Sequence, residues 1–211
     1  METSAAPASP LEIGAAAPDF IARSTQGRLQ LSDYAGRWVL LFAHPADFTP
    51  VCTSELIALQ RALPQFEAAG CALIGLSVDS LPAHLAWAQD IEARFGVRLT
   101  FPLVEDISMA VARAYGMIHA ASNSTATVRA SFIIDPQRTI RAILHYPAEV
   151  GRSAAELLRL LLALQAADAA GAAAPEGWRP GERLLAAPVE TLQEARARGP
   201  DWYLRPAGEA R

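Results

Sequence analysis

The chain has 211 residues, 52% of them hydrophobic and 19% charged, which excludes a disordered chain and allows a buried core. The net charge of −4 gives no indication of the basic surface that a nucleic-acid-binding protein has. The apolar runs of the chain are too short or too interrupted to span a membrane. Two cysteines are too few for a disulfide framework or a Cys/His metal site, and the N-terminus shows no secretory signal, so we expect a cytoplasmic protein without a metal or cofactor.

Apolar runs that alternate with helical patterns predict an α/β fold. In chain order, the predicted elements are a buried strand at 37–44, a helix at 49–66 that Pro64 kinks or ends, a buried strand at 71–80, a helix at 81–96, a short strand at 100–106, a helix at 108–117, two strands at 129–135 and 139–146 joined by a hairpin turn, and a long helix between Ser153 and Gly171. This order favours a three-layer sandwich with a mixed sheet.

The character of the chain changes after Gly171. The remaining residues are rich in Pro, Gly and Arg and show only short elements. We therefore divide the chain into a main domain at 1–170 and a C-terminal extension at 171–211, which we expect to be too small to fold alone.

The segment "HPADFTPVCTSEL", residues 44–56, places a cysteine where a helix is about to begin. Thr49 suits the N-cap and Pro50 the first helical position, so Cys52 is the third residue of the helix. A thiolate there would be stabilised by the free backbone N–H groups and the positive end of the helix dipole. The alternative is a small buried apolar side chain, but α/β folds place reactive groups at the carboxyl ends of strands.

This segment resembles the active-site segment of the peroxiredoxins, whose pattern Pro-x-x-x-Thr-x-x-Cys is met by Pro45, Thr49 and Cys52. Its His-Pro form is similar to the peroxiredoxin 6, or 1-Cys, subfamily. Further similar segments follow in order: "SVDSLPAHLAW", "AYGM", "STATVRASFIIDP", "ILHYPAEVGR" and "GWRPGE". The resemblance implies a thioredoxin-like fold, with a mixed central sheet flanked by helices and a small C-terminal α+β extension.

The resemblance also implies catalytic roles. Cys52 would attack the terminal oxygen of a hydroperoxide and become a sulfenic acid. Thr49 would orient the peroxide, and Pro45 would shield the thiol. Arg129 would hold the thiolate and polarise the O–O bond as a fixed cation.

Supporting roles are implied for His44, near the thiol, and for Glu55 and Arg152, which would orient Arg129. Alternatives remain at these positions: His44 as a hydrogen-bonded core histidine, and the other two as an ordinary surface pair. The remaining three histidines show no ligand spacing, and we interpret them as structural: His84, His119 and His145.

Cys71 opens a predicted central strand, so we expect a buried and inert thiol. The extension contains no cysteine, which leaves the sulfenic acid without a resolving thiol and predicts a one-cysteine mechanism completed by an external thiol or other reductant. The resemblance implies a homodimer, or a higher ring, whose C-terminal part reaches the neighbouring subunit. It does not extend to phospholipase activity, because "LSDYAGRWVL" holds no Gly-x-Ser-x-Gly motif.

Two other functions compete with that of a peroxidase. A redox sensor or holdase triggered by oxidation of Cys52 is the alternative, since an accessible reactive cysteine suits sensing as well. A dithiol exchanger of the thioredoxin kind is disfavoured, because position 49 holds threonine where that motif has its other cysteine.

Overall fold

The computed structural model describes residues 11–118 and 124–208, and the chain divides into two compact units, Met1–Ala154 and Ala155–Arg211. The first unit holds a seven-stranded sheet. The predicted domain boundary at 170/171 stays a prediction. In the described part of the chain, no helix is long and apolar enough to cross a membrane.

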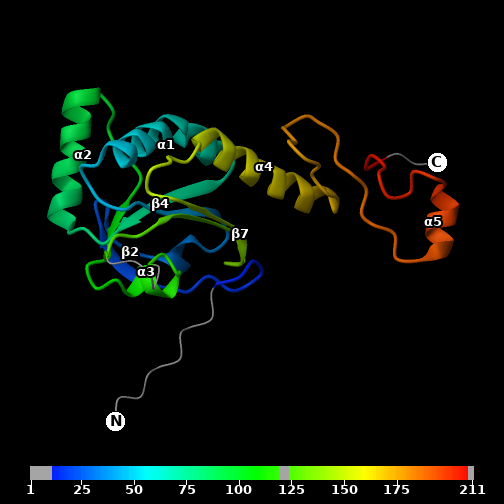
Figure 1. Ribbon diagram of the computed structural model, residues 1–211, viewed down its shortest axis with the longest axis horizontal. Helices are drawn as coiled ribbons and strands as arrows, with labels where there is room; N and C mark the ends of the chain where they lie inside the picture. The colour runs from blue at the N-terminus through cyan, green and yellow to red at the C-terminus, as the bar shows by residue number, and fades with distance from the viewer. Residues whose placement is uncertain (1–10, 119–123, 209–211) are drawn as a thin grey trace, which may run out of the picture. The chain divides into compact units, whose positions relative to one another are not determined.

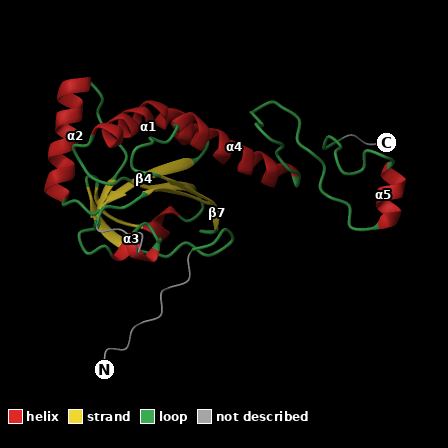
Figure 2. Ribbon diagram, viewed as in Figure 1, coloured by secondary structure: helices red, strands yellow, loops and turns green. Residues whose placement is uncertain are grey.

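The sheet is mixed, with strand order β2-β1-β5-β4-β3-β6-β7. Its strands are yellow in Figure 2. Its strands are β1 Ile21–Ser24, β2 Gly27–Gln30, β3 Trp38–Ala43, β4 Cys71–Ser77, β5 Leu103–Glu105, β6 Arg129–Ile134 and β7 Ile140–Tyr146. β3, β4 and β5 are parallel, whereas every other neighbouring pair is antiparallel. This sheet, flanked by helices, confirms the predicted fold class.

Helices cover both faces of the sheet: in Figure 1, α1 and α3 lie on opposite sides of it. The helices of the first unit are α1 Pro50–Ala68, α2 Leu81–Phe95 and the short α3 Ala110–Ala114. All six residues of β3 are buried because both of its faces are covered, which explains its continuous apolar sequence. Its alternate residues Val39 and Leu41 share a core with Val111 of α3.

Several elements differ from the sequence-based expectations. Pro64 does not end α1, because it lies on the exposed side of the helix, where water can hydrate the carbonyl that its ring leaves without a donor. The helix expected at 108–117 is only the five residues of α3. The β1–β2 hairpin was not predicted, since its strands are short and largely polar.

The second unit contains α4, Ala154–Ala170, which begins at the boundary, and α5, Leu192–Arg198. A capping box between Thr191 and Glu194 starts α5, none of whose seven residues is buried. Trp178 is buried within this unit, and its indole N–H donates to the carbonyl of Glu182 at 3.1 Å. The extension therefore combines short elements with little apolar core.

Candidate active site

The site begins where the central strand β3 ends and the chain enters α1 through the loop at 44–49. Cys52 is the third residue of α1, as predicted, and is fully buried. Thr49 occupies the N-cap position with extended backbone angles, but its side chain does not cap the helix. Its hydroxyl donates instead to the carbonyl of Ala46 at 2.9 Å, so the predicted capping bond is wrong although the position is right.

A guanidinium group lies directly against the thiol. Arg129 is the first residue of β6, which pairs with β3, and its Nη1 is 3.3 Å from Sγ of Cys52. Its Nε and Nη2 both donate to the carbonyl of Ala148, at 3.1 and 2.8 Å. Because the side chain is buried and held at three nitrogens, its charge has a fixed position beside the sulfur.

A buried carboxylate joins this arginine to a second one. Oε2 of Glu55 accepts from Nη1 of Arg129 at 2.6 Å and from Nη2 of Arg152 at 3.0 Å. Its Oε1 accepts from the backbone N–H and Nε of Arg152, at 2.7 and 2.8 Å. All three side chains are buried, so the interpretation of Glu55 and Arg152 as a surface pair is wrong.

The charges of this cluster do not cancel, since two guanidinium groups face one carboxylate. Burial alone would raise the pKa of Glu55, but the hydrogen bonds and charge of Arg152, together with the charge of Arg129, outweigh it and hold that pKa below its ordinary value. One positive charge is therefore left uncompensated beside Sγ. This arrangement favours an anion at Cys52.

The loop before α1 contains a second buried cluster. Pro45 is half-buried, whereas His44 is completely buried, and its Nε2 lies 2.8 Å from Oδ1 of Asp47. The other carboxylate oxygen of Asp47 is 2.7 Å from Nδ1 of His84 in α2. Sequence patterns did not indicate Asp47 and suggested a structural His84, because the two lie 37 positions apart and no local spacing links them.

Comparison with known proteins gives two family matches. Residues 13–143 match the AhpC/TSA family, and residues 163–200 match the C-terminal domain of 1-Cys peroxiredoxin. A protein named peroxiredoxin 2 from Caldanaerobacter subterraneus subsp. tengcongensis is 48% identical over 201 residues, covering 92% of this chain and 91% of its own. The chain belongs to the peroxiredoxin family.

Solved structures support this placement. A structure of the yeast mitochondrial 1-Cys peroxiredoxin matches with a TM-score of 0.84 and 38% identity, covering 93% of this chain and 99% of its own. A cysteine-to-serine mutant of the peroxiredoxin 6 of Arenicola marina matches with a TM-score of 0.83 and 32% identity, covering 95% and 99%. This peroxiredoxin is therefore a peroxidase with the thioredoxin-like fold of its family.

The buried histidines of this peroxiredoxin could in principle hold a metal ion together with Asp47, since their ligand atoms lie within 4.8 Å of one another. The separations of 2.7 and 2.8 Å are hydrogen-bond lengths. Two ligands of a tetrahedral zinc ion would be about 3.3 Å apart, given metal–nitrogen and metal–oxygen distances of about 2.0–2.1 Å. The geometry therefore fits direct hydrogen bonds between these side chains better than metal coordination.

The second cysteine lies in a different environment. Cys71 is the first residue of β4 and is fully buried. Burial raises the pKa of its thiol to about 12, so it is protonated at neutral pH. This agrees with the expected inert thiol, because the thiolate is the reactive form.

A groove of about 470 Å³ lies beside the first turn of α1. It is lined partly by Thr49 and by apolar side chains, namely Phe48, Pro50, Ile57, Trp87 and Phe95. Phe48 and Phe95 are 58% and 52% exposed. The turn that carries Cys52 thus adjoins an open apolar surface.

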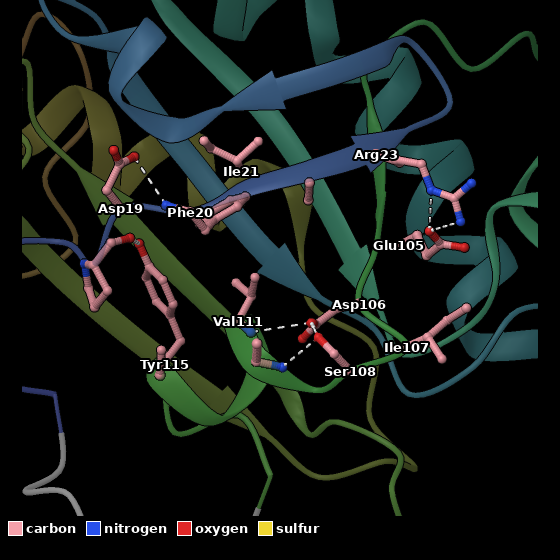
Figure 3. A pocket seen from close by; sticks show the side chains of 14 residues that line it. Asp19, Phe20, Ile21, Arg23, Glu105, Asp106, Ile107, Ser108, Val111 and Tyr115 are labelled. Carbon is pink, nitrogen blue, oxygen red and sulfur yellow. Dashed lines mark hydrogen bonds and ion pairs between the residues drawn. The ribbon is translucent and has the colours of Figure 1, made fainter.

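A cavity of about 710 Å³ lies elsewhere, between β1, the end of β5 and α3 (Figure 3). Neither cysteine is among the described residues that line it. Its charged groups have partners within the protein: Nε of Arg23 donates to Glu105 at 2.8 Å, and Asp106 accepts from the backbone N–H of Val111 at 3.2 Å. Among the described residues that line this cavity there is thus no thiol, and the guanidinium of Arg23 is paired with Glu105.

Proposed function

We propose that this peroxiredoxin reduces hydrogen peroxide and organic hydroperoxides through Cys52 alone. The thiolate attacks the terminal peroxide oxygen, so that an S–O bond forms and the O–O bond breaks. The leaving oxygen takes a proton and departs as water or an alcohol, and Cys52 becomes a sulfenic acid. The observation that supports this most is the guanidinium of Arg129 at 3.3 Å from Sγ inside a buried, net-positive cluster.

The neighbouring side chains have separate roles in this proposal. Arg129 stabilises the thiolate and the negative charge that develops on the breaking O–O bond. Glu55 and Arg152 hold Arg129 in place, and Pro45 shields the thiol. The hydroxyl hydrogen of Thr49 is used by Ala46, which leaves its oxygen lone pairs free to accept a hydrogen bond from the peroxide.

An external thiol completes the cycle in this proposal. One thiol condenses with the sulfenic acid and releases water, and a second thiol reduces the mixed disulfide and returns Cys52 to the thiol. The buried, protonated Cys71 is unsuited to this step, and residues 171–211 contain no cysteine. The related yeast mitochondrial 1-Cys peroxiredoxin has a thiol-resolving mechanism via the glutathione and thioredoxin systems, which supports an external thiol here.

Exchange of Cys52 for serine tests the proposal. We expect Cys52→Ser to abolish peroxide consumption in the presence of a dithiol, because the nucleophile is lost. The matched control is Cys71→Ala, which should consume peroxide at the rate of the unaltered protein. Mass spectrometry after one equivalent of peroxide should find the added oxygen on Cys52. Undiminished turnover by Cys52→Ser would refute the assignment.

The groove beside Thr49 supports organic hydroperoxides as substrates, because its apolar side chains can take the hydrocarbon part. We expect Phe95→Ser to lower kcat/KM for an aromatic hydroperoxide by about tenfold, the equivalent of about 1.4 kcal/mol of lost apolar contact, and to leave hydrogen peroxide unaffected. Ile107→Ser, which removes a similarly exposed side chain outside the groove, is the control. Equal slowing for both peroxides would contradict the assignment.

We also propose that residues 171–211 form an arm of a homodimer. Three large apolar side chains of this segment are strongly exposed: Leu192, Tyr203 and Leu204, at 76%, 70% and 61%. Such surface suits burial against another subunit. Sedimentation velocity at micromolar concentration should give a dimer or a ring of dimers, and a monomer would contradict the proposal.

A further inference from the structure

The cluster of His44, Asp47 and His84, here called the His–Asp–His array, joins the loop before α1 to α2. His44, directly after β3, and Asp47 both lie in the loop before α1, whereas His84 lies in α2. All three are buried, with side-chain exposures of 1%, 3% and 0%. Asp47 is the central member, since each of its carboxylate oxygens contacts one histidine. The array therefore connects the loop before Cys52 to the core.

The partners of His84 determine its protonation. Its Nε2 lies 3.1 Å from the carbonyl oxygen of Val104, which can only accept a hydrogen bond. Its Nδ1 lies 2.7 Å from the carboxylate of Asp47. A neutral imidazole has one N–H group, whereas these two acceptors require two. Both contacts are satisfied when His84 is an imidazolium and Asp47 is ionised.

The same geometry determines the tautomer of His44. The carboxylate of Asp47 accepts from Nε2–H, which leaves Nδ1 without hydrogen when the ring is neutral. Burial lowers the pKa of His44, and the charges of His84 and Arg152 lower it further, against the opposing effect of Asp47. Nδ1 is buried and has no hydrogen-bond partner among the described residues. It is thus a bare acceptor.

Further contacts secure the loop around Asp47. Its backbone N–H donates to Oδ2 of Asp79 at 3.0 Å, and that oxygen also accepts from the hydroxyl of Ser77 at 2.7 Å. The next residue, Phe48, has a φ of 55°, in the left-handed region that is unfavourable for a bulky side chain. Such a conformation needs anchors on both sides. Asp47 provides one immediately before Phe48, and the start of α1 follows at Pro50.

We propose that His84 is a positioning residue of the Cys52 site: as an imidazolium it holds the Asp47 carboxylate, which fixes His44 with Nδ1 as a bare acceptor and anchors the loop that carries Thr49. This proposal rests on the proposed function of Cys52. Three further charged groups among the described residues act on the array. Asp79 accepts a hydrogen bond from the backbone N–H of Asp47, and Glu105 and Arg152 interact electrostatically with His84 and His44, respectively. Replacing His84 should therefore make the loop more mobile and remove the preference of His44 for the tautomer with a bare Nδ1.

The protonation states can be measured without any peroxide. Nitrogen-15 NMR of the reduced protein with labelled histidine should show both ring nitrogens of His84 protonated at neutral pH. The same spectrum should show His44 with Nε2 protonated and Nδ1 bare. A bare nitrogen on His84 would overturn the proposal. This result does not depend on whether Cys52 is the nucleophile, so it separates failure of the array from failure of the proposed function.

Kinetics test the effect of the array on the reaction. We expect His84→Gln, which keeps a donor but loses the cation, to slow oxidation of Cys52 by hydrogen peroxide about tenfold, the usual effect of losing a charged hydrogen bond. As the pH is lowered, the oxidation rate of this variant should begin to fall at a higher pH than that of the unaltered protein. The reason is that Asp47 loses its counter-ion and takes up a proton more readily. His84→Phe, which keeps a ring but no donor, should show a larger effect of the same kind.

Tyr115→Phe is the control, since it also removes a buried hydrogen bond, from the Tyr115 hydroxyl to the carbonyl of Pro18 at 2.8 Å. It should leave both the rate and the pH profile unchanged. A purely structural role for His84 predicts lower stability with an unaltered pH profile in the folded variants, and that result would overturn the proposal. If His84→Phe does not fold, the kinetics of His84→Gln and the NMR spectrum of the unaltered protein still test the proposal.

Discussion

Replacement of Arg129 by lysine is expected to slow the oxidation of Cys52 by hydrogen peroxide about 10²–10³-fold, as loss of a fixed donor to a developing negative charge commonly does. Lysine keeps the positive charge but has a single nitrogen. It cannot donate to Sγ of Cys52, to Glu55 and to the carbonyl of Ala148 in the geometry that the guanidinium provides. A slower reaction would show that the position of the guanidinium is required as well as its positive charge.

Stopped-flow measurement of thiol loss under single-turnover conditions gives this rate without involving the reductant. Arg141→Lys is the matched control: Arg141 lies in β7, where it contacts Asp135 at 3.5 Å and lies over the ring of Trp38. Thermal unfolding of both variants shows whether they are folded. If folded Arg129→Lys retains the rate of the unaltered protein, the donor geometry of the guanidinium is not required and a positive charge at position 129 is sufficient.

Replacement of Glu55 by glutamine is expected to lower the free energy of unfolding by about 3–5 kcal/mol, because it leaves two buried guanidinium groups without their counter-ion. That is a large fraction of the roughly 5–15 kcal/mol that typically stabilises a domain. Urea denaturation followed by fluorescence measures the change. Asp90→Asn, which breaks the exposed Asp90–Arg94 pair, is the control and should leave the midpoint almost unchanged.

The pH dependence of stability tests independently whether the Glu55 carboxylate is ionised in the folded protein. The pKa of Glu55 is lowered in the folded protein, so its contribution is fully present above its ordinary value, about 4.3, and is lost as the pH falls through the lower folded value. The unaltered protein should therefore lose stability on acidification more steeply than Glu55→Gln. Parallel acid titrations of the two proteins would show that Glu55 is not the ionised partner of the arginines.

The fold was largely predictable from local patterns. The apolar runs at 37–44 and 71–80 form the central strands β3 and β4, because parallel strands covered on both faces have continuous apolar sequences. The β1–β2 hairpin escaped prediction, since its pairing is determined by contacts with the rest of the sheet more than by its own four-residue strands. α5 was also not predicted, for a different reason: none of its seven residues is buried, so it shows no apolar periodicity, and the Thr191–Glu194 capping box is its main local signal.

The candidate site was only partly predictable. The position of Cys52 in the first turn of α1 follows from the Thr-Pro pair before it, which is a local signal. The hydroxyl of Thr49 does not cap the helix as expected, because the carbonyl of Ala46 competes for it in the folded loop. No local signal pointed to the His–Asp–His array, since His84 has no ligand spacing to another histidine.

By itself, the sequence determined that a cysteine follows a buried strand at the start of a helix, because strand burial, helix capping and helix polarity depend on neighbouring residues. Only the tertiary structure decided which charges surround that cysteine. Glu55 meets Arg129 and Arg152 across 74 and 97 positions of the chain, and those contacts exist only when β6 and the segment after β7 are brought against α1. Electrostatic stabilisation depends on distance and burial, and neither is a property of sequence spacing.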